Sequence, residues 1–338
     1  MQTTNPNFPQ DYIQYDTQNY ERFIKSYAED LRTSYNRSLK TITENTKFDG
    51  RIIITGTSWS LNAAKITTDY LKEKINIQYA ESFDETINLN EKDILIAISY
   101  SGNSEEAATW LKFARRKGTQ TILITAGEKL QENTYDSKII DLTRNLPSRC
   151  STFTIIGTLL KLFEDANLID KQIEEVQKTV NYIREQNLKE ITTEISQKIL
   201  GKIPIIYATW PIKNAAQKLK RLINANAKTT AFFNTIPGAE YYELEGYTTK
   251  NAQFHAIILS SADDMSRIRK KTTILKNTLQ NQGVDVTELN IKAQGLVKQA
   301  TIILLSEYIA YYLALRYKQD PLNDEITEKI KKDTGIFI

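Results

Sequence analysis

Short apolar runs alternate with longer stretches of helical periodicity along most of the chain. Buried apolar runs of this length predict β-strands at 51–56, 75–80, 93–99, 121–127, 138–142, 203–208, 230–234, 254–260 and 285–291. Apolar positions three and four residues apart predict helices at 60–74, 104–117, 151–166, 211–226, 264–282, 295–318 and 323–333. Strands that alternate with helices in this way indicate parallel βαβ units with helices on both faces of a sheet.

The remaining segments indicate how these units are organised. The first 45 residues are polar and rich in tyrosine, and their apolar positions predict a helix over 20–35. A charged helical stretch at 170–198 separates two similar α/β halves. We therefore expect two doubly wound, flavodoxin-like domains, 1–170 and 171–338, the first with an N-terminal helix and the second with a linker helix.

Composition narrows the classes of function. Lys+Arg 44 against Asp+Glu 41 gives a net charge of +3, too small to indicate a nucleic-acid or membrane partner. Cys150 is the only cysteine and His255 the only histidine, so we expect no metal site. His255 falls inside a predicted strand, where a core histidine is the favoured interpretation. No long apolar span and no signal peptide are present, which favours a cytoplasmic protein.

Two polar turns follow central strands of the first half and lead directly into helices. They are TGTSWS at 55–60 and SYSGNS at 99–104. Ligands of open parallel sheets bind beyond the carboxyl ends of the strands, and serine hydroxyls at helix N-termini suit an anion. Serine is also a common helix N-cap, so simple capping is the alternative. The chain lacks the glycine motifs of dinucleotide and nucleoside-triphosphate sites.

The turn ISYSGNSEEA resembles the signature of sugar isomerase (SIS) domains, which hold the phosphate of a phosphosugar, and GTSWS resembles its companion turn. GTSWS is also similar to the isomerase half of glutamine–fructose-6-phosphate amidotransferases. Almost the whole chain resembles the archaeal-type bifunctional phosphoglucose/phosphomannose isomerases. The segments that carry this wider resemblance are NLPSR (145–149), KLKRLINANAK (218–228), PGAEYYELEGY (237–247) and the tail from Asp320.

The resemblance implies a SIS fold, a phosphorylated hexose as ligand, no cofactor and a homodimer. It implies that a group of serines binds the phosphate: Ser58, Ser60, Ser99, Ser101 and Ser104. Arg149 matches the arginine that stabilises the enediolate, and Lys331 matches an active-site lysine of the tail. A guanidinium suits this role because it stays charged at any physiological pH.

The chain departs from the family at two catalytic positions. Ala225 stands where the family has its proton-transfer glutamate, and Tyr241 stands where it has the ring-opening histidine. Glu240, beside Tyr241, is a new carboxylate, and Glu240 with Tyr241 is the pair we expect to replace the missing groups. Three functions therefore stay open: an aldose–ketose isomerase, a phosphosugar-binding paralogue without isomerase activity, and an enzyme with altered activity on an amino-sugar phosphate.

Overall fold

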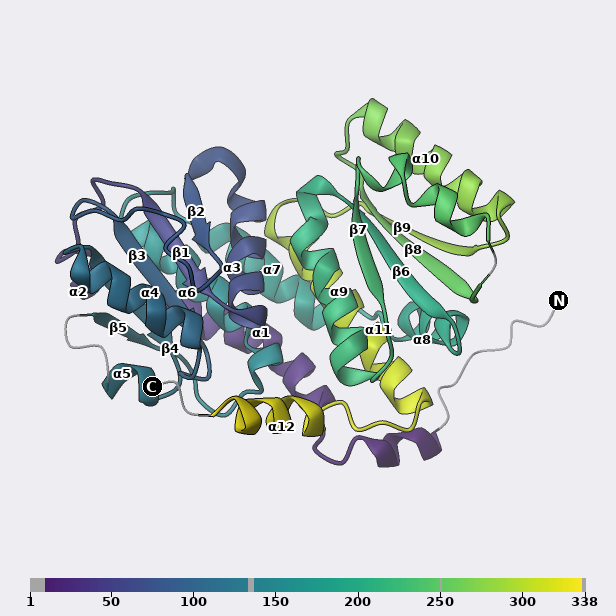
Figure 1. Ribbon diagram of the computed structural model, residues 1–338, viewed down its shortest axis with the longest axis horizontal. Helices are drawn as coiled ribbons and strands as arrows, with labels where there is room; N and C mark the ends of the chain where they lie inside the picture. The colour runs from purple at the N-terminus through teal and green to yellow at the C-terminus, as the bar shows by residue number, and fades with distance from the viewer. Residues whose placement is uncertain (1–9, 133–136, 250, 336–338) are drawn as a thin grey trace. The chain divides into compact units, whose positions relative to one another are not determined.

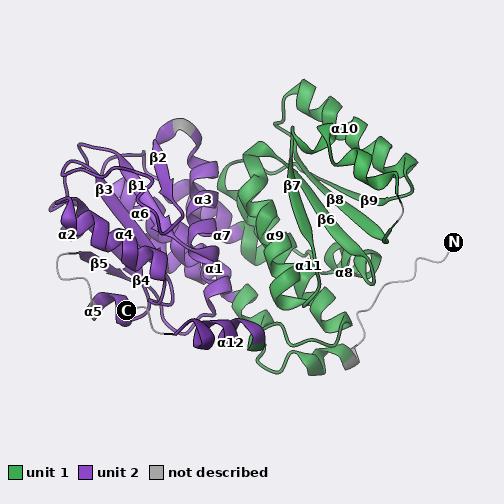
Figure 2. Cartoon of the chain, in the orientation of Figure 1, with its two compact units in different colours: residues 1–25, 182–325 green, residues 26–181, 326–338 purple. Residues whose placement is uncertain are grey.

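The computed structural model describes residues 10–132, 137–249 and 251–335 (Figure 1). The chain forms two compact units, shown in different colours in Figure 2. The first-sheet unit comprises Ser26–Asn181 and Ile326–Ile338, and the second-sheet unit comprises Met1–Lys25 and Tyr182–Glu325. The mixed α/β architecture expected from the sequence is confirmed.

The first-sheet unit is built on five parallel strands in the order β2-β1-β3-β4-β5, the order of a flavodoxin-like fold. The strands are β1 (Ile52–Gly56), β2 (Ile77–Ala80), β3 (Ile94–Ser99), β4 (Gln120–Thr125) and β5 (Lys138–Asp141). The helices that accompany them are α1 (Glu21–Asn36), α2 (Lys40–Thr43), α3 (Ser58–Leu71), α4 (Glu105–Arg116), α5 (Lys129–Glu132), α6 (Thr152–Asp165) and α7 (Ile173–Glu185).

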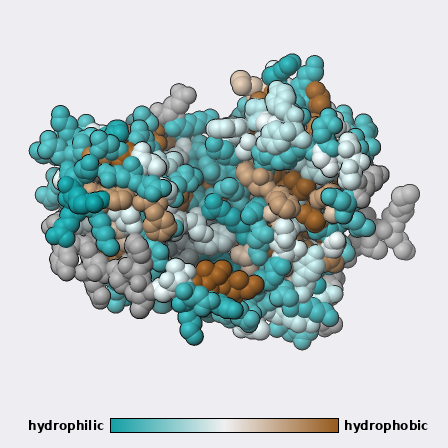
Figure 3. Space-filling view, in the orientation of Figure 1, coloured by the Kyte–Doolittle hydropathy of each residue, from teal (hydrophilic) through white to brown (hydrophobic). Residues whose placement is uncertain are grey.

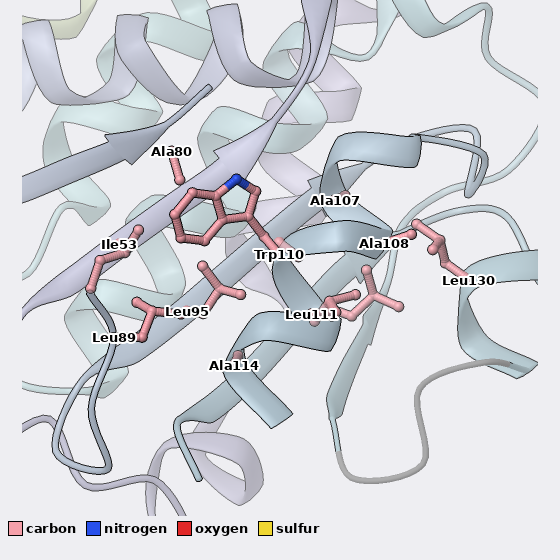
Figure 4. Packing of buried hydrophobic residues seen from close by; sticks show 12 residues of the cluster. Ile53, Ala80, Leu89, Leu95, Ala107, Ala108, Trp110, Leu111, Ala114 and Leu130 are labelled. Carbon is pink, nitrogen blue, oxygen red and sulfur yellow. The ribbon is translucent and has the colours of Figure 1, made fainter. Parts of the chain in front are cut away.

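Alternate residues of these strands supply the two faces of the sheet, because side chains along a strand point to opposite sides. Ile53, Leu95 and Leu123 face α4 and pack around Trp110, whose ring lies in the centre of this layer (Figure 4). The Trp110 indole N–H donates to the carbonyl of Ser82 at 2.7 Å, so burial leaves no polar atom of this side chain unpaired. The core therefore holds β1, β3 and β4 in register.

The second-sheet unit repeats this plan with four parallel strands in the order β7-β6-β8-β9. They are β6 (Ile203–Thr209), β7 (Phe232–Ile236), β8 (Phe254–Ser261) and β9 (Asp285–Ile291). Its helices are α8 (Lys189–Ile199), α9 (Lys213–Asn226), α10 (Ser266–Asn281) and α11 (Gly295–Arg316). Lys218 of α9 and Glu307 of α11 form a fully buried ion pair at 3.1 Å.

The two units differ from the expected domains 1–170 and 171–338 in three places. The chain passes from one unit to the other after Asn181, and the tail from Ile326 belongs to the first-sheet unit. Residues 10–25 belong with the second sheet, because the Tyr20 hydroxyl donates to Glu307 at 2.6 Å and the Tyr311 hydroxyl donates to Asp16 at 3.1 Å.

The expected linker helix over 170–198 is two helices, α7 and α8. The break falls at 186–188, where the side-chain oxygen of Asn187 accepts the Lys189 N–H at 3.2 Å and starts a new helix. Charged residues continue on both sides of this break, so the sequence pattern alone gives no sign that the helix is interrupted. An asparagine that bonds to nearby backbone in this way competes with a continuous helix.

The last helix, α12 (Glu325–Thr334), has no buried residues. Its apolar positions Ile326 and Ile330 are 78% and 60% exposed. Figure 3 shows a face that is mostly hydrophilic, with apolar residues reaching it in a few patches. Within the described ranges, no helix is long and apolar enough to cross a membrane.

Candidate functional site

The carboxyl edge of the first sheet brings two helix N-termini together. β1 and β3 are neighbouring strands, with Gly56 opposite Ile98. α3 begins two residues after β1, and α4 begins six residues after β3. Because both strands run in the same direction, the turns that follow them lie at one edge. A helix N-terminus carries a positive partial charge, so this edge suits an anion.

Hydrogen bonds join the two polar turns to each other. The Thr57 and Ser104 hydroxyl oxygens lie 3.2 Å apart. The backbone N–H of Tyr100 donates to the Ser60 hydroxyl oxygen at 3.1 Å. Ser60 thereby uses its acceptor on the neighbouring turn, while its own proton can still be donated. The two turns form one connected site, and Thr57 is a member that the sequence analysis did not select.

The turn after β3 is folded by its own serines. Ser99 accepts the backbone N–H of Ser104 at 3.2 Å, and Ser101 accepts that of Asn103 at 3.4 Å. Ser104 caps α4 by accepting the Ala107 N–H at 3.2 Å, as its residue type predicts. Capping and a place in the connected site are therefore compatible roles for Ser104.

Burial divides the five selected serines into two groups. Ser60, Ser99 and Ser104 are buried, with at most 9% of each residue exposed. Ser58 and Ser101 are exposed. A dissolved ligand can therefore reach Ser58 and Ser101 directly, whereas the other three hydroxyls mainly hold the turns in shape.

Two glycines allow the turns after β3 and β4 to touch. Gly102 has a φ of +70°, a conformation that glycine adopts without strain. A Cβ at Gly102 would lie 2.8 Å from backbone atoms of Gly127, and one at Gly127 would lie 2.1 Å from the carbonyl oxygen of Ser101. Any larger residue at either position would push the exposed Ser101 away from its present place.

Arg149 lies in the same unit, in a short 3-10 helix, Ser148–Cys150, before α6. It is only 5% exposed. A guanidinium this buried needs polar partners, because an isolated buried charge is costly. The hydrogen bond from the Cys150 N–H to the Pro147 carbonyl, at 2.7 Å, closes the turn that carries Arg149.

Glu240 and Tyr241 lie in the second-sheet unit and share a partner that the sequence analysis missed. The Lys271 ammonium of α10 donates to Glu240 at 2.5 Å and to the Tyr241 hydroxyl oxygen at 2.6 Å. An ammonium can only donate, so the phenol proton of Tyr241 is left to point elsewhere. Tyr241 is 73% exposed and can offer that proton to a ligand.

Glu240 itself is held in its charged form. Burial alone would raise the pKa of its carboxyl, but hydrogen bonds from Lys271 and from the backbone N–H of Gly238, at 2.7 Å, hold it below the usual value. A carboxylate with a lowered pKa is a weak base. This geometry therefore suits Glu240 better for orienting Lys271 than for accepting a proton from a sugar carbon.

The remaining candidate positions, Ala225, Lys331 and His255, lie outside the serine turns and the Glu240–Lys271 group. Ala225 is half-buried near the end of α9 and presents only a methyl group. Lys331 lies on the exposed helix α12 and forms an ion pair with Glu328 at 2.6 Å. His255 is 2% exposed, and its Nε2 lies 2.8 Å from the Thr287 hydroxyl. These contacts place His255 in the core of the second sheet, as expected, but among the described residues its buried Nδ1 has no hydrogen-bond partner, so the expected fully satisfied histidine is not found.

Comparison with known families and structures matches both halves of the chain. Residues 48–159 match the family described as "SIS domain", and residues 188–333 match "Bacterial phospho-glucose isomerase C-terminal SIS domain". A bifunctional phosphoglucose/phosphomannose isomerase of Caldicellulosiruptor bescii is 28% identical over 320 residues, which cover 88% of this chain and 94% of that protein.

Two further relatives widen the comparison. A D-glucosamine-6-phosphate 4-epimerase of Sulfolobus acidocaldarius is 31% identical over 182 residues, 52% of this chain and 58% of that protein. The C-terminal domain of a glucosamine-fructose-6-phosphate aminotransferase from Francisella tularensis superposes with a TM-score of 0.67 over 90% of this chain and 97% of that one. At 13% identity this last likeness supports the fold alone.

Proposed function

Because the chain is a member of the SIS-domain phosphosugar isomerase family, we propose that it binds a phosphorylated hexose and interconverts its aldose and ketose forms. The observation that carries this proposal is the joined pair of serine turns at the N-termini of α3 and α4. The substrates we favour are glucose 6-phosphate or mannose 6-phosphate with fructose 6-phosphate.

The phosphate occupies the carboxyl edge of the first sheet in this proposal. Ser58 and Ser101 donate to its oxygens, while Ser60, Ser99 and Ser104 keep the two turns in position. The free N–H dipoles of α3 and α4 add a favourable field. A hydrogen bond to a charged group contributes about 1.5–3 kcal/mol, so two such contacts give useful affinity.

The candidates for the proton chemistry come from the family resemblance. Arg149 stabilises the charge of the enediolate, and Lys331 remains a candidate cation. Tyr241, oriented by Lys271, donates the proton that opens the sugar ring. Glu240 holds Lys271 in place, and this arrangement gives Tyr241 the role that the family's histidine has. Ala225 cannot accept a proton, so proton transfer between C1 and C2 needs another group or a water molecule.

A second candidate is an enzyme that acts on an amino-sugar phosphate. The relative from Sulfolobus acidocaldarius supports it, because that protein is a D-glucosamine-6-phosphate 4-epimerase and is 31% identical to this chain over 182 residues. The two replaced catalytic positions, Ala225 and Tyr241, support altered chemistry as well. A phosphosugar-binding paralogue without isomerase activity is the third candidate, since it needs only the serine turns.

The family resemblance also supports a homodimer as the assembly and the cytoplasm as the place of action. No cofactor or metal is required by the proposed chemistry. We expect neither a nucleic acid nor a membrane as a partner, because the net charge of +3 provides little attraction to either.

The deciding experiment is turnover of glucose 6-phosphate, mannose 6-phosphate and fructose 6-phosphate, followed by proton NMR. We expect wild-type turnover near the ordinary enzyme range of about 1 s⁻¹ or more. Ser101→Ala should weaken substrate binding about 10- to 100-fold, because a hydrogen bond to a charged phosphate is lost. Ser137→Ala is the matched control, since its hydroxyl bonds to Thr121 at 2.8 Å, away from the turns.

Ala225→Glu separates the candidates. If an intact wild type binds fructose 6-phosphate but turns over none of the three sugars, isomerase activity is excluded. Activity that appears only in Ala225→Glu would then identify a binding paralogue on an isomerase fold. Consumption of glucosamine 6-phosphate, with the three hexose phosphates that lack an amino group untouched, would support the second candidate.

A further inference from the structure

Tyr100 lies in the signature turn among the selected serines, but it is not one of the proposed phosphate ligands. It lies between Ser99 and Ser101 in the signature turn and is 4% exposed. A large side chain at this position cannot reach a dissolved ligand. Its contacts run instead to three other segments of the same unit.

The backbone of Tyr100 connects the signature turn to two neighbouring turns. Its N–H donates to the Ser60 hydroxyl oxygen at 3.1 Å, which fixes the companion turn after β1. Its carbonyl accepts the Ala126 N–H at 3.0 Å, which fixes the turn after β4. The backbone of Tyr100 therefore joins three turns at the carboxyl edge.

The phenol of Tyr100 reaches a fourth segment, the loop that leads to Arg149. Its hydroxyl donates to the Thr143 carbonyl at 2.7 Å and accepts the Leu146 N–H at 2.9 Å. Leu146 immediately precedes Pro147, which begins the turn that carries Arg149. Burial raises the pKa of the Tyr100 phenol to about 12, so the group stays neutral and can both donate and accept.

We propose that Tyr100 is a positioning residue that sets the place of Arg149 relative to the phosphate-binding serines. The inference rests on the proposed function, because it assumes that Ser101 binds phosphate and that Arg149 meets the enediolate charge. In this proposal, Tyr100 contacts neither the phosphate nor the enediolate of the ligand. It acts by holding the turn at 99–104 and the loop at 143–146 at one fixed separation.

Binding of two different ligands distinguishes this positioning role from a general structural role of Tyr100. Fructose 6-phosphate tests the phosphate-binding turns. The second ligand, 5-phospho-D-arabinonate, also carries a carboxylate where the enediolate charge develops, so it tests Arg149 as well. We expect Tyr100→Phe to weaken binding of 5-phospho-D-arabinonate tenfold or more, since misplacement by about 1 Å can cost up to about 10²-fold in a site of this kind.

Binding of fructose 6-phosphate by Tyr100→Phe should weaken less than threefold in the same calorimetric titrations. Tyr79→Phe is the matched control. Tyr79 lies on β2 of the same sheet, and its hydroxyl lies 2.6 Å from that of Thr68, outside the serine turns. This control should change neither affinity.

A double-mutant cycle with Arg149→Met tests whether Tyr100 acts through Arg149. With Arg149 already replaced, Tyr100→Phe should have no further effect on 5-phospho-D-arabinonate binding. Equal weakening of both ligands by Tyr100→Phe, or independent effects of the two substitutions, would overturn the proposal. If Arg149→Met does not fold, the ratio of the two affinities in Tyr100→Phe alone decides the question.

The outcomes also separate this proposal from the proposed function. A wild type that binds neither ligand contradicts both. A wild type that binds both ligands, with Tyr100→Phe indistinguishable from Tyr79→Phe, leaves phosphosugar binding intact and excludes only the positioning role.

Discussion

The two sheets end in turns of the same backbone design and opposite chemistry. After β3, the Gly102 N–H donates to the Ser99 carbonyl at 3.0 Å, and after β8 the Asp264 N–H donates to the Ser261 carbonyl at 3.0 Å. Each turn then leads into a helix, α4 or α10. The backbone hydrogen bond at this position is therefore common to both halves of the chain.

The side chains of the two turns differ in charge. The turn after β3 offers serine hydroxyls and glycine, whereas the turn after β8 carries Asp263 and Asp264. Asp264 accepts the Ser261 N–H at 2.8 Å, and Asp263 forms an ion pair with Lys298 at 2.5 Å. In the second turn, carboxylates therefore accept the hydrogen bonds of the Ser261 N–H and of Lys298, and these negative charges would repel an anion. The turn after β3 carries no charged residue between Ser99 and Ser104, although Glu106 of α4 accepts from the Ser104 hydroxyl at 3.2 Å. The proposed anion site therefore depends on which positions of this shared architecture carry a charge.

The largest effect is expected from giving the first turn the charge of the second. Ser101→Asp places a carboxylate where the phosphate binds, and juxtaposed like charges cost several kcal/mol. We expect the affinity for fructose 6-phosphate to fall about 10³-fold, as measured by calorimetry. Asp263→Asn is the control in the second turn and should change the affinity less than threefold. Comparable losses in both variants would show that the two turns are not distinguished in this way.

The next effect concerns the close approach of Gly102 to Gly127. Gly102→Ala combines a strained positive φ with a backbone clash at 2.8 Å, and we expect a loss of about 3 kcal/mol in unfolding free energy. Gly118 has a similar φ of +66° but nothing within 4 Å of its added Cβ. Gly118→Ala should therefore cost only about 1 kcal/mol in denaturant titrations. Equal costs would mean that contact with Gly127 contributes nothing.

A smaller effect comes from His255 in the second sheet. Burial, followed by the nearby charge of Lys202, lowers the pKa of His255 to about 4. Below pH 6.5 this histidine binds a proton in the unfolded chain but stays neutral in the folded chain. The unfolding free energy therefore falls as the pH drops from 6.5 towards 4. From His255 alone, the loss between pH 6.5 and 5 is about 1.6 kcal/mol. Burial raises the pKa of Asp30 to about 6, which adds stability as the pH falls and opposes this effect, so the test is the difference between wild type and His255→Asn. In urea titrations, wild type should lose more stability than His255→Asn between pH 6.5 and 5; equal losses would contradict the account.

Apolar runs identified the central strands β1 and β3, because parallel strands buried throughout are apolar on both faces. The partly exposed strands β2, β7 and β9 were also identified, from their place in the alternation of strands and helices. The break between α7 and α8 was missed, since it lies within a continuous charged pattern and its local mark is a hydrogen bond from the Lys189 N–H to the Asn187 side chain. The N-terminal segment lies in the compact unit of the second sheet. This placement depends on contacts such as Tyr20 with Glu307, which are 287 residues apart in the sequence.

The serine turns could be selected from sequence because strand, turn and helix follow one another locally. Tyr100 and Lys271 could not. Their importance lies in partners at positions such as Thr143 and Glu240, which only the fold brings close. Gly127 carried no signal either, as its requirement for a small residue arises from the neighbouring turn. Thr57 lies within the selected turn at 55–60, so its hydroxyl next to Ser58 could have been included from the sequence.

The most direct test of the central claim is a crystal structure of the chain with fructose 6-phosphate. The account predicts the phosphate at the N-termini of α3 and α4, with oxygens in hydrogen-bond contact with Ser58 and Ser101. A phosphate bound at the turn after β8, beside Asp263 and Lys298, would contradict it, as would a sugar phosphate bound with Ser101 outside hydrogen-bond reach.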